Sequence, residues 1–120
     1  MALIFNHFEF NITHTKLKPR LGTYKDRDEL KKVLKFLEFD VRIFNDLKYV
    51  QLIDELAKAS KEDHTNHDCI VIVVMSHGDE GVVQAYDVEY RVNELWDNFV
   101  GNNCKSLIGK PKMVFIQVSC

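Results

Sequence analysis

The apolar run at residues 69–75 constrains the fold more than any other segment, and it reads Cys-Ile-Val-Ile-Val-Val-Met. Five of its seven residues are β-branched, and apolar side chains occupy both alternating positions. This pattern is typical of a strand buried on both faces, as in a parallel sheet covered by helices on each side. The run is too short for a membrane span, which needs about 20 apolar residues. The sequence therefore predicts a central parallel strand here.

The remaining hydrophobic pattern alternates between strand and helix periodicity. Asp26, with Glu29 three residues later, is expected to cap one helix, and Asp46 is expected to cap a second. Residues 6–25 are predicted to form a long loop, and residues 76–81 a polar loop after the central strand. The other expected strands cover 2–5, 39–43, 82–85, 89–92 and 113–117, and the expected helices cover 26–37, 46–60 and 93–100. This order predicts an α/β fold, with a mostly parallel sheet and helices on both faces.

Length and composition indicate one soluble globular domain. The 120 residues carry 16 lysines and arginines against 18 aspartates and glutamates, a formal net charge of −2, and 46% of them are hydrophobic. This balance argues against disorder and against a strongly basic nucleic-acid-binding surface. The first residues lack the basic start and the small-residue cleavage site of a signal peptide. We therefore expect a cytoplasmic protein that binds neither membrane nor nucleic acid, with Cys69, Cys104 and Cys120 as reduced thiols.

His77 and Gly78 follow the central strand almost directly. In parallel sheets, functional residues lie beyond the carboxyl ends of the strands. An imidazole there faces a cleft, and the backbone N–H of a glycine can approach a substrate closely enough to stabilise an oxyanion. A His-Gly turn without any chemistry explains the same two residues equally well.

One weaker candidate for a metal site arises from spacing. His64, His67 and Cys69 read H-x2-H-x-C. Cys69 opens the buried strand, however, and no fourth ligand lies nearby in the sequence, whereas structural zinc sites are almost always four-coordinate. We therefore expect no metal site, and no other cofactor is indicated.

A small basic cluster lies in the long loop and consists of Lys16, Lys18 and Arg20. We expect this cluster to face a substrate rather than a nucleic acid. A nucleotide-binding α/β domain is a further alternative, but it needs a glycine-rich loop after its first strand. Residues 6–18 contain no glycine, which disfavours that alternative.

The last predicted strand ends at Gln117, and motifs along the chain match one family in order. Caspases carry the signature Q-A-C-[RQG]-G, with the catalytic histidine about 50 residues upstream, and His77 lies a comparable distance before Gln117. The other matching segments are Ala-Leu-Ile-Phe-Asn at 2–6, Arg-Leu-Gly-Thr at 20–23, Lys-Glu-Asp-His at 61–64, Ser-His-Gly at 76–78 and Ser-Leu-Ile-Gly-Lys-Pro-Lys at 106–112. The chain resembles the large (p20) subunit of a caspase over nearly its whole length and is most similar to the effector caspases of arthropods.

The resemblance implies a caspase-like fold for residues 1–120, as a large-subunit domain that is incomplete without the small subunit. It also implies a cysteine-type endopeptidase that cleaves after aspartate in apoptosis. In such an enzyme a thiolate attacks the peptide carbonyl, His77 would transfer protons, and Gly78 would donate a hydrogen bond to the oxyanion. Arg20 would grip the substrate aspartate through its planar fork, and Gln117 would line the same pocket.

The partners implied by the resemblance are proteins. They are a caspase small subunit, with two large/small heterodimers forming a dimer, and protein substrates with an aspartate at the cleavage site. Residues 1–120 contain no segment that resembles the small subunit. We therefore expect this chain to be a fragment that is inactive alone.

The chain departs from the family pattern at its last three residues. The family cysteine lies two residues after the glutamine, where this chain has Ser119, and Val118 replaces a small alanine. Cys120 comes one residue late, and a slip of one residue at a strand end turns the side chain to the opposite face. Cys120 therefore does not inherit the role of nucleophile. Ser119 is a poor substitute, because a hydroxyl stays protonated where a caspase thiol ionises near neutral pH.

Two explanations of this ending stay open. Val-Ser can be encoded by GTG-AGT, the consensus start of an intron, so translation past an unspliced exon end after Gln117 would produce it. We expect this explanation to hold, for an otherwise active caspase. The alternative is a catalytically dead homologue that binds active caspases as a decoy, and the genomic sequence after the Gln117 codon distinguishes the two.

Overall fold

The computed structural model describes residues 1–11 and 18–119 of the chain. Two α-helices, three 3-10 helices and six strands are present in these two segments. In order, they are β1 (Ala2–Asn6), α1 (Thr23–Phe36), β2 (Val41–Asn45), α2 (Tyr49–Ser60), β3 (Ile70–Asp79), β4 (Val82–Gln84), β5 (Glu89–Arg91), η1 (Val92–Leu95), η2 (Asp97–Phe99), η3 (Gly101–Leu107) and β6 (Lys112–Ser119).

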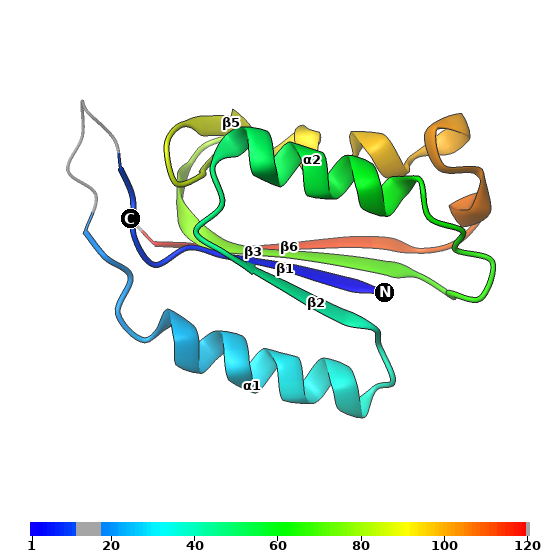
Figure 1. The fold of residues 1–120 in the computed structure, drawn as a ribbon, viewed down its shortest axis with the longest axis horizontal. Helices are drawn as coiled ribbons and strands as arrows, with labels where there is room; N and C mark the ends of the chain where they lie inside the picture. The colour runs from blue at the N-terminus through cyan, green and yellow to red at the C-terminus, as the bar shows by residue number, and fades with distance from the viewer. Residues whose placement is uncertain (12–17, 120) are drawn as a thin grey trace.

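The described strands form one six-stranded sheet. β1 lies between β2 and β3 and is parallel to both, and β6 lies parallel to β3 on its other side. β4 and β5 form an antiparallel extension in which β4 pairs with the last residues of β3. Helix α1 covers one face of the sheet, and α2 with the 3-10 helices covers the opposite face (Figure 1). This arrangement confirms the predicted α/β fold, with its mostly parallel sheet and helices on both faces.

Side-chain alternation along the parallel strands divides the core into two clusters. The larger cluster joins the sheet to α2 and the 3-10 helices, and its fully buried members include Leu3, Phe5, Leu52, Leu56, Ile70, Leu95, Phe99 and Leu107. The smaller cluster joins the sheet to α1 and contains Ala2, Ile4, Leu34, Val71, Val73 and Met75. Burial of each large apolar side chain contributes about 1.5–3 kcal/mol to folding. No helix among the described residues is long and apolar enough to cross a membrane.

Helix α1 begins three residues before the predicted start. Its N-cap is Gly22, whose φ of +85° is a conformation that glycine adopts without steric strain, and no side chain caps the helix. The predicted capping by Asp26 and Glu29 is therefore wrong. Asp26 lies in the first turn instead, where its negative charge faces the positive end of the helix dipole.

The predicted capping role of Asp46 is also wrong. Helix α2 begins at Tyr49, and the Gln51 side chain accepts a hydrogen bond from the backbone N–H of Lys48 at 3.0 Å. Asp46 has a φ of +53°, which an aspartate tolerates better than most residues. Its Oδ1 atom accepts hydrogen bonds from the backbone N–H groups of Phe8 and Glu9, at 2.7 and 3.0 Å. These bonds hold the segment that follows β1 in place.

The predicted loop at residues 76–81 is mostly strand. β3 continues to Asp79, because β6 pairs with it as far as His77 and β4 pairs with Gly78 and Asp79. The chain turns at Gly81, whose φ is +73°. Hydrogen bonds from two neighbouring strands therefore override the polar composition of this segment.

The predicted helix at 93–100 is replaced by the three 3-10 helices. Val100 is extended and Gly101 has a φ of +54°, and this break in the backbone prevents a continuous α-helix. The apolar side chains in and just after α1 are only partly buried: Leu34 is buried, whereas Val33 and Leu37 are more than half exposed.

Candidate functional site

Strand register brings the candidate residues to the carboxyl ends of β1, β3 and β6. Met75 of β3 pairs with Asn6 of β1 and with Gln117 of β6, and two residues later His77 pairs with Ser119. The segments that follow β1 and precede α1 return to the same end of the sheet. The structure therefore gathers the candidate residues at the end of the sheet where the sequence led us to expect function.

His77 is half-buried, and its ring is fixed on two sides. Its Nε2 atom lies 2.9 Å from the backbone oxygen of Lys18. Because a carbonyl oxygen can only accept, Nε2 carries the hydrogen, and Nδ1 is the basic nitrogen of the neutral ring. The ring of Phe10 packs against the imidazole with 4.9 Å between centroids. These contacts leave the ring in a defined tautomer and orientation.

Gly78 lies where three strands meet. A Cβ atom at this residue would lie 2.8 Å from Cγ1 of Val118 and 2.9 Å from the carbonyl oxygen of Val82. The second contact is with backbone, which cannot easily move away. Only glycine therefore fits beside β4 and β6 at this point.

Arg20 is 7% exposed, and its guanidinium is anchored by atoms of two other residues. Its Nη1 donates to the backbone oxygen of His7 at 3.0 Å and to Oγ1 of Thr23 at 2.8 Å. The Thr23 hydroxyl in turn donates to Oδ1 of Asn6, at the end of β1. Burial lowers the pKa of the Arg20 guanidinium, but a nearby carboxylate, Asp26, opposes this shift. The result is a buried cation held in a fixed orientation at the carboxyl end of the sheet.

Gln117 is exposed near the end of β6. It lines a groove of about 330 Å³ together with Asp26 and Leu30 of α1 and Phe115 of β6. The structure thus brings Gln117 to the side of the sheet that α1 covers, in register with the strand that leads to His77.

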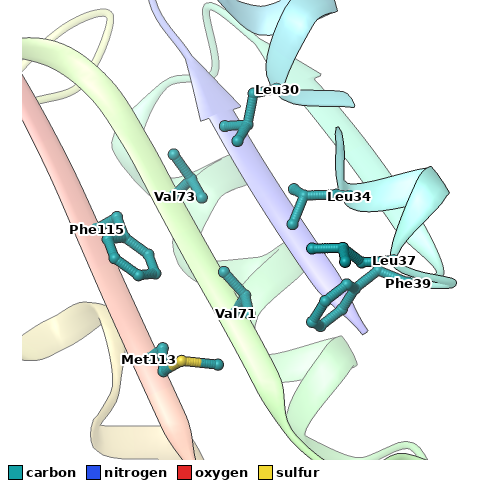
Figure 2. A pocket seen from close by; sticks show the side chains of 8 residues that line it. All are labelled: Leu30, Leu34, Leu37, Phe39, Val71, Val73, Met113 and Phe115. Carbon is teal, nitrogen blue, oxygen red and sulfur yellow. The ribbon is translucent and has the colours of Figure 1, made fainter. Parts of the chain in front are cut away.

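A second, wholly apolar groove lies farther along the same face. Figure 2 shows side chains of α1, the segment after it, β3 and β6 around this space, whose volume is about 410 Å³; they are Leu30, Leu34, Leu37, Phe39, Val71, Val73, Met113 and Phe115. Phe115 is 56% exposed although it is aromatic. Among the described residues β6 pairs with β3 alone, so its other edge carries unpaired backbone groups.

The H-x2-H-x-C residues have other roles in the structure. The ring of His64 is fully buried, with Nε2 at 2.7 Å from the backbone oxygen of Ala59 and Nδ1 at 3.0 Å from Nδ1 of His67. Cys69 is a free thiol just before β3, and Cys104 is a second, buried one. Within residues 1–11 and 18–119, no group of three or more His, Cys, Asp or Glu side chains is arranged to hold a metal ion.

Several contributors to the site carry no clear signal in the sequence. Lys18 acts through its carbonyl oxygen, so its side chain gives no indication of the contact with His77. Phe10 and Thr23 act through ring packing and a hydroxyl, and only Thr23 belongs to a predicted motif. Lys16, from the predicted basic cluster, and Cys120 lie outside the described residues.

Comparison with known proteins agrees with this geometry. Residues 1–120 match the caspase domain family. Caspase drICE of Drosophila melanogaster is 41% identical over 117 residues, which cover 98% of this chain and 34% of that protein. Caspase-6 of Gallus gallus is 44% identical over 117 residues, which cover 98% of this chain and 38% of that protein. The chain thus spans between a third and two fifths of the length of these relatives.

Solved structures give the same result. A crystal structure of caspase-1 from Spodoptera frugiperda matches with a TM-score of 0.94 at 42% identity, covering 98% of this chain and 46% of that one. A structure of pro-sf-caspase-1 matches with a TM-score of 0.95 at 40% identity over the whole of this chain and 45% of the other. Because the family match, the sequence identity and the fold all extend over nearly every residue, this chain belongs to the caspase family.

Proposed function

We propose that this chain supplies the proton-transferring and aspartate-binding groups of a cysteine-type endopeptidase that cleaves after aspartate. One observation carries the proposal: the ring of His77 is fixed by the carbonyl of Lys18, and its backbone is in register with residue 119. Residue 119 is where the family pattern places the nucleophile. A general base of defined tautomer beside a nucleophile is the arrangement that acyl transfer needs.

In a chain that carries Ser119→Cys, the proposed reaction begins with proton transfer from the introduced thiol to Nδ1 of His77. The thiolate attacks the scissile carbonyl, and the oxyanion accepts hydrogen bonds from the backbone N–H groups of Gly78 and of the nucleophile. His77 then protonates the leaving amine, and water hydrolyses the acyl-enzyme with His77 as base. The Lys18 carbonyl stabilises the charged imidazolium throughout, because it accepts the hydrogen bond from Nε2.

Recognition of aspartate is assigned to Arg20. The guanidinium is planar and permanently charged, and its anchoring by the His7 carbonyl and Thr23 sets its orientation before a substrate arrives. Gln117 is proposed as a further polar group at this end of the sheet. Because Arg20 is almost fully buried, a bound carboxylate would meet little competition from water.

The proposed partner is a caspase small subunit, seated on the groove of Figure 2 and along the free edge of β6. The groove is wholly apolar, and the adjacent strand edge offers backbone donors and acceptors. A partner that adds a strand to β6 and a helix beside α1 would cover both. We further propose that two such large/small pairs form the active assembly, which acts in apoptosis.

One observation favours a second function. Ser119 stands at the nucleophile position, and its hydroxyl is not ionised near neutral pH. A chain with this residue could bind the partner of an active caspase without cleaving substrate, and would then act as a decoy. The groups around Arg20 and His77 are compatible with both functions.

The test is to assemble the chain with a caspase small subunit and measure hydrolysis of a fluorogenic aspartyl peptide. We expect no hydrolysis with the sequence as it stands, and hydrolysis when Val118→Ala and Ser119→Cys are introduced together. His77→Ala in the altered chain is the control and should abolish the activity. An assembled chain that carries both substitutions and is still inactive would contradict the peptidase proposal. Inhibition of an active caspase by the unaltered chain would support the decoy function.

A further inference from the structure

The ring of His7 is the buried titratable group that the proposed mechanism leaves unused. His7 follows β1 and is 1% exposed, and neither ring nitrogen has a hydrogen-bond partner among the described residues. Buried polar groups are nearly always hydrogen-bonded, so an imidazole without partners in this environment needs an explanation. An apolar side chain of the same size would fill the space without leaving a donor unsatisfied.

The surroundings of His7 connect it to both functional groups of the site. Its backbone oxygen accepts the 3.0 Å hydrogen bond from Arg20, and its backbone N–H donates to Met75 of β3 at 3.0 Å. Its ring stacks on Phe10, with 6.1 Å between centroids, and the same Phe10 ring packs on His77 at 4.9 Å. The ring of Phe10 therefore contacts both imidazoles: it stacks on His7 and is tilted by 47° to His77. We call these three rings the stack.

Two charged groups act on His7. Asp46 lies in the turn after β2, and its carboxylate is already occupied by the N–H groups of Phe8 and Glu9. Arg20, from the segment before α1, is a cation and opposes a second positive charge nearby. Burial is the largest effect and lowers the pKa of His7. The Asp46 carboxylate opposes this shift and Arg20 adds to it, so that the pKa falls from 6.5 to about 4. His7 is consequently uncharged at neutral pH, and protonation would place a cation beside Arg20.

We infer that His7 is a positioning residue of this site: its ring packs on Phe10, which in turn packs on His77, while its carbonyl holds Arg20. This inference rests on the proposed function, because positioning matters only if His77 and Arg20 act on a substrate. When His7 gains a proton, repulsion from Arg20 disturbs the stack and the anchored guanidinium together. His7 therefore couples the positions of His77 and Arg20, and this coupling is lost when His7 is protonated in acid.

The experiment uses the 120-residue chain with labelled histidines and arginines and follows each imidazole by NMR from about pH 8 to about pH 3. The 15N shifts of His77 report which ring nitrogen carries the hydrogen. In the unaltered chain we expect the Nε2–H tautomer at neutral pH, and a change in the His77 and Arg20 side-chain signals that coincides with the titration of His7. If His7 titrates and these signals do not respond, the inference is wrong.

Variants separate the ring from its charge. His7→Ala removes the support for Phe10, and we expect the His77 tautomers to become mixed at neutral pH. His7→Phe restores an aromatic ring that cannot ionise, so the tautomer should return while the acid response disappears. Tyr90→Phe is the matched control, because the Tyr90 hydroxyl is also buried without a partner among the described residues but belongs to the core cluster beside α2. This variant should change neither the His77 tautomer nor the acid response.

A second variant covers the case in which His7→Ala fails to fold. Phe10→Ala removes the middle ring of the stack from a half-buried residue, and it should produce the same mixture of His77 tautomers. Unchanged His77 signals in both variants would overturn the inference. These spectra do not depend on peptide hydrolysis. An assembled chain with Val118→Ala and Ser119→Cys that hydrolyses no peptide would contradict the proposed function, whereas coupled signals in its spectra would still support the role of His7 in positioning His77 and Arg20.

Discussion

The two faces of the sheet differ in how completely this chain covers them. On the α2 side, Leu56, Leu95 and Phe99 are fully buried, and the 3-10 helices close the cluster. On the α1 side, Leu37 is 58% exposed and Phe115 is 56% exposed, and an apolar groove stays open between them (Figure 2). The comparison shows that α1 alone does not cover the apolar side chains on its side of the sheet. The polar groups of the candidate site lie at the end of this half-covered sheet.

The largest expected difference between the faces concerns stability. Leu56→Ala should lower the free energy of unfolding by about 2–5 kcal/mol, because the side chain is fully buried and its loss leaves a cavity. Phe115→Ala is the matched variant on the open face and should cost less than about 1 kcal/mol, since water already reaches the ring. Urea unfolding of both variants measures this, and equal losses would show that the faces are equally covered.

The next effect is the pH dependence that originates at the polar end of the sheet. His7 has a pKa of about 4 when folded and 6.5 as an ordinary histidine, so the unfolded chain binds more protons between these values. Stability is therefore fully present above pH 6.5 and is lost as the pH falls toward 4, by about 3 kcal/mol. Urea unfolding at several pH values should show this loss, and His7→Phe should lack it. The same acid sensitivity in both chains would contradict the assignment to His7.

A smaller effect is expected at Arg20, the proposed aspartate-binding group. In an assembly that carries Ser119→Cys, Arg20→Lys should reduce kcat/KM for an aspartyl peptide by roughly 10- to 100-fold. Lysine keeps the charge but loses the planar fork that binds a carboxylate through two hydrogen bonds. Steady-state kinetics provide the measurement, with Arg91→Lys at an exposed residue of β5 as the control. An unchanged kcat/KM would show that Arg20 does not bind the substrate aspartate.

The smallest effect concerns association through the open face. The free edge of β6 and the groove beside it should let the isolated chain self-associate. Phe115→Lys places a charge at this surface and should weaken association by roughly tenfold in Kd. Val50→Lys is the control, because Val50 is 74% exposed on α2 and lies away from the groove. Analytical ultracentrifugation of both variants measures the dissociation constant of self-association. Equal dissociation constants would show that the chain does not associate through β6 and the groove.

The fold could be predicted largely because the apolar run at 69–75 admits few alternatives. Its β-branched residues form the buried part of β3, and helices cover both faces as expected. The errors arose where tertiary contacts override local signals. Asp46 resembles a helix cap in sequence, yet its carboxylate binds the chain after β1. Ser76 and Gly78 read as loop, but pairing with β4 and β6 makes them strand.

Candidate site residues could be proposed from the sequence only where they act through their side chains. His77, Arg20 and Gln117 belong to motifs, and the structure brings each to the carboxyl end of the sheet. The Lys18 carbonyl leaves no trace in sequence, because every residue has one. The stack of His7 on Phe10 depends on the path of the loop between β1 and α1, which local patterns do not determine.

The most direct test of the account compares two peptides that differ only at the cleavage position, one with aspartate and the other with asparagine. The chain is assembled with a caspase small subunit and carries Val118→Ala and Ser119→Cys. The account predicts cleavage of the aspartyl peptide at least about 100-fold faster in kcat/KM, because the charged pair with Arg20 is lost in asparagine. It also predicts that His77→Ala abolishes both reactions. Equal cleavage of the two peptides, or cleavage that survives His77→Ala, would contradict the central claim.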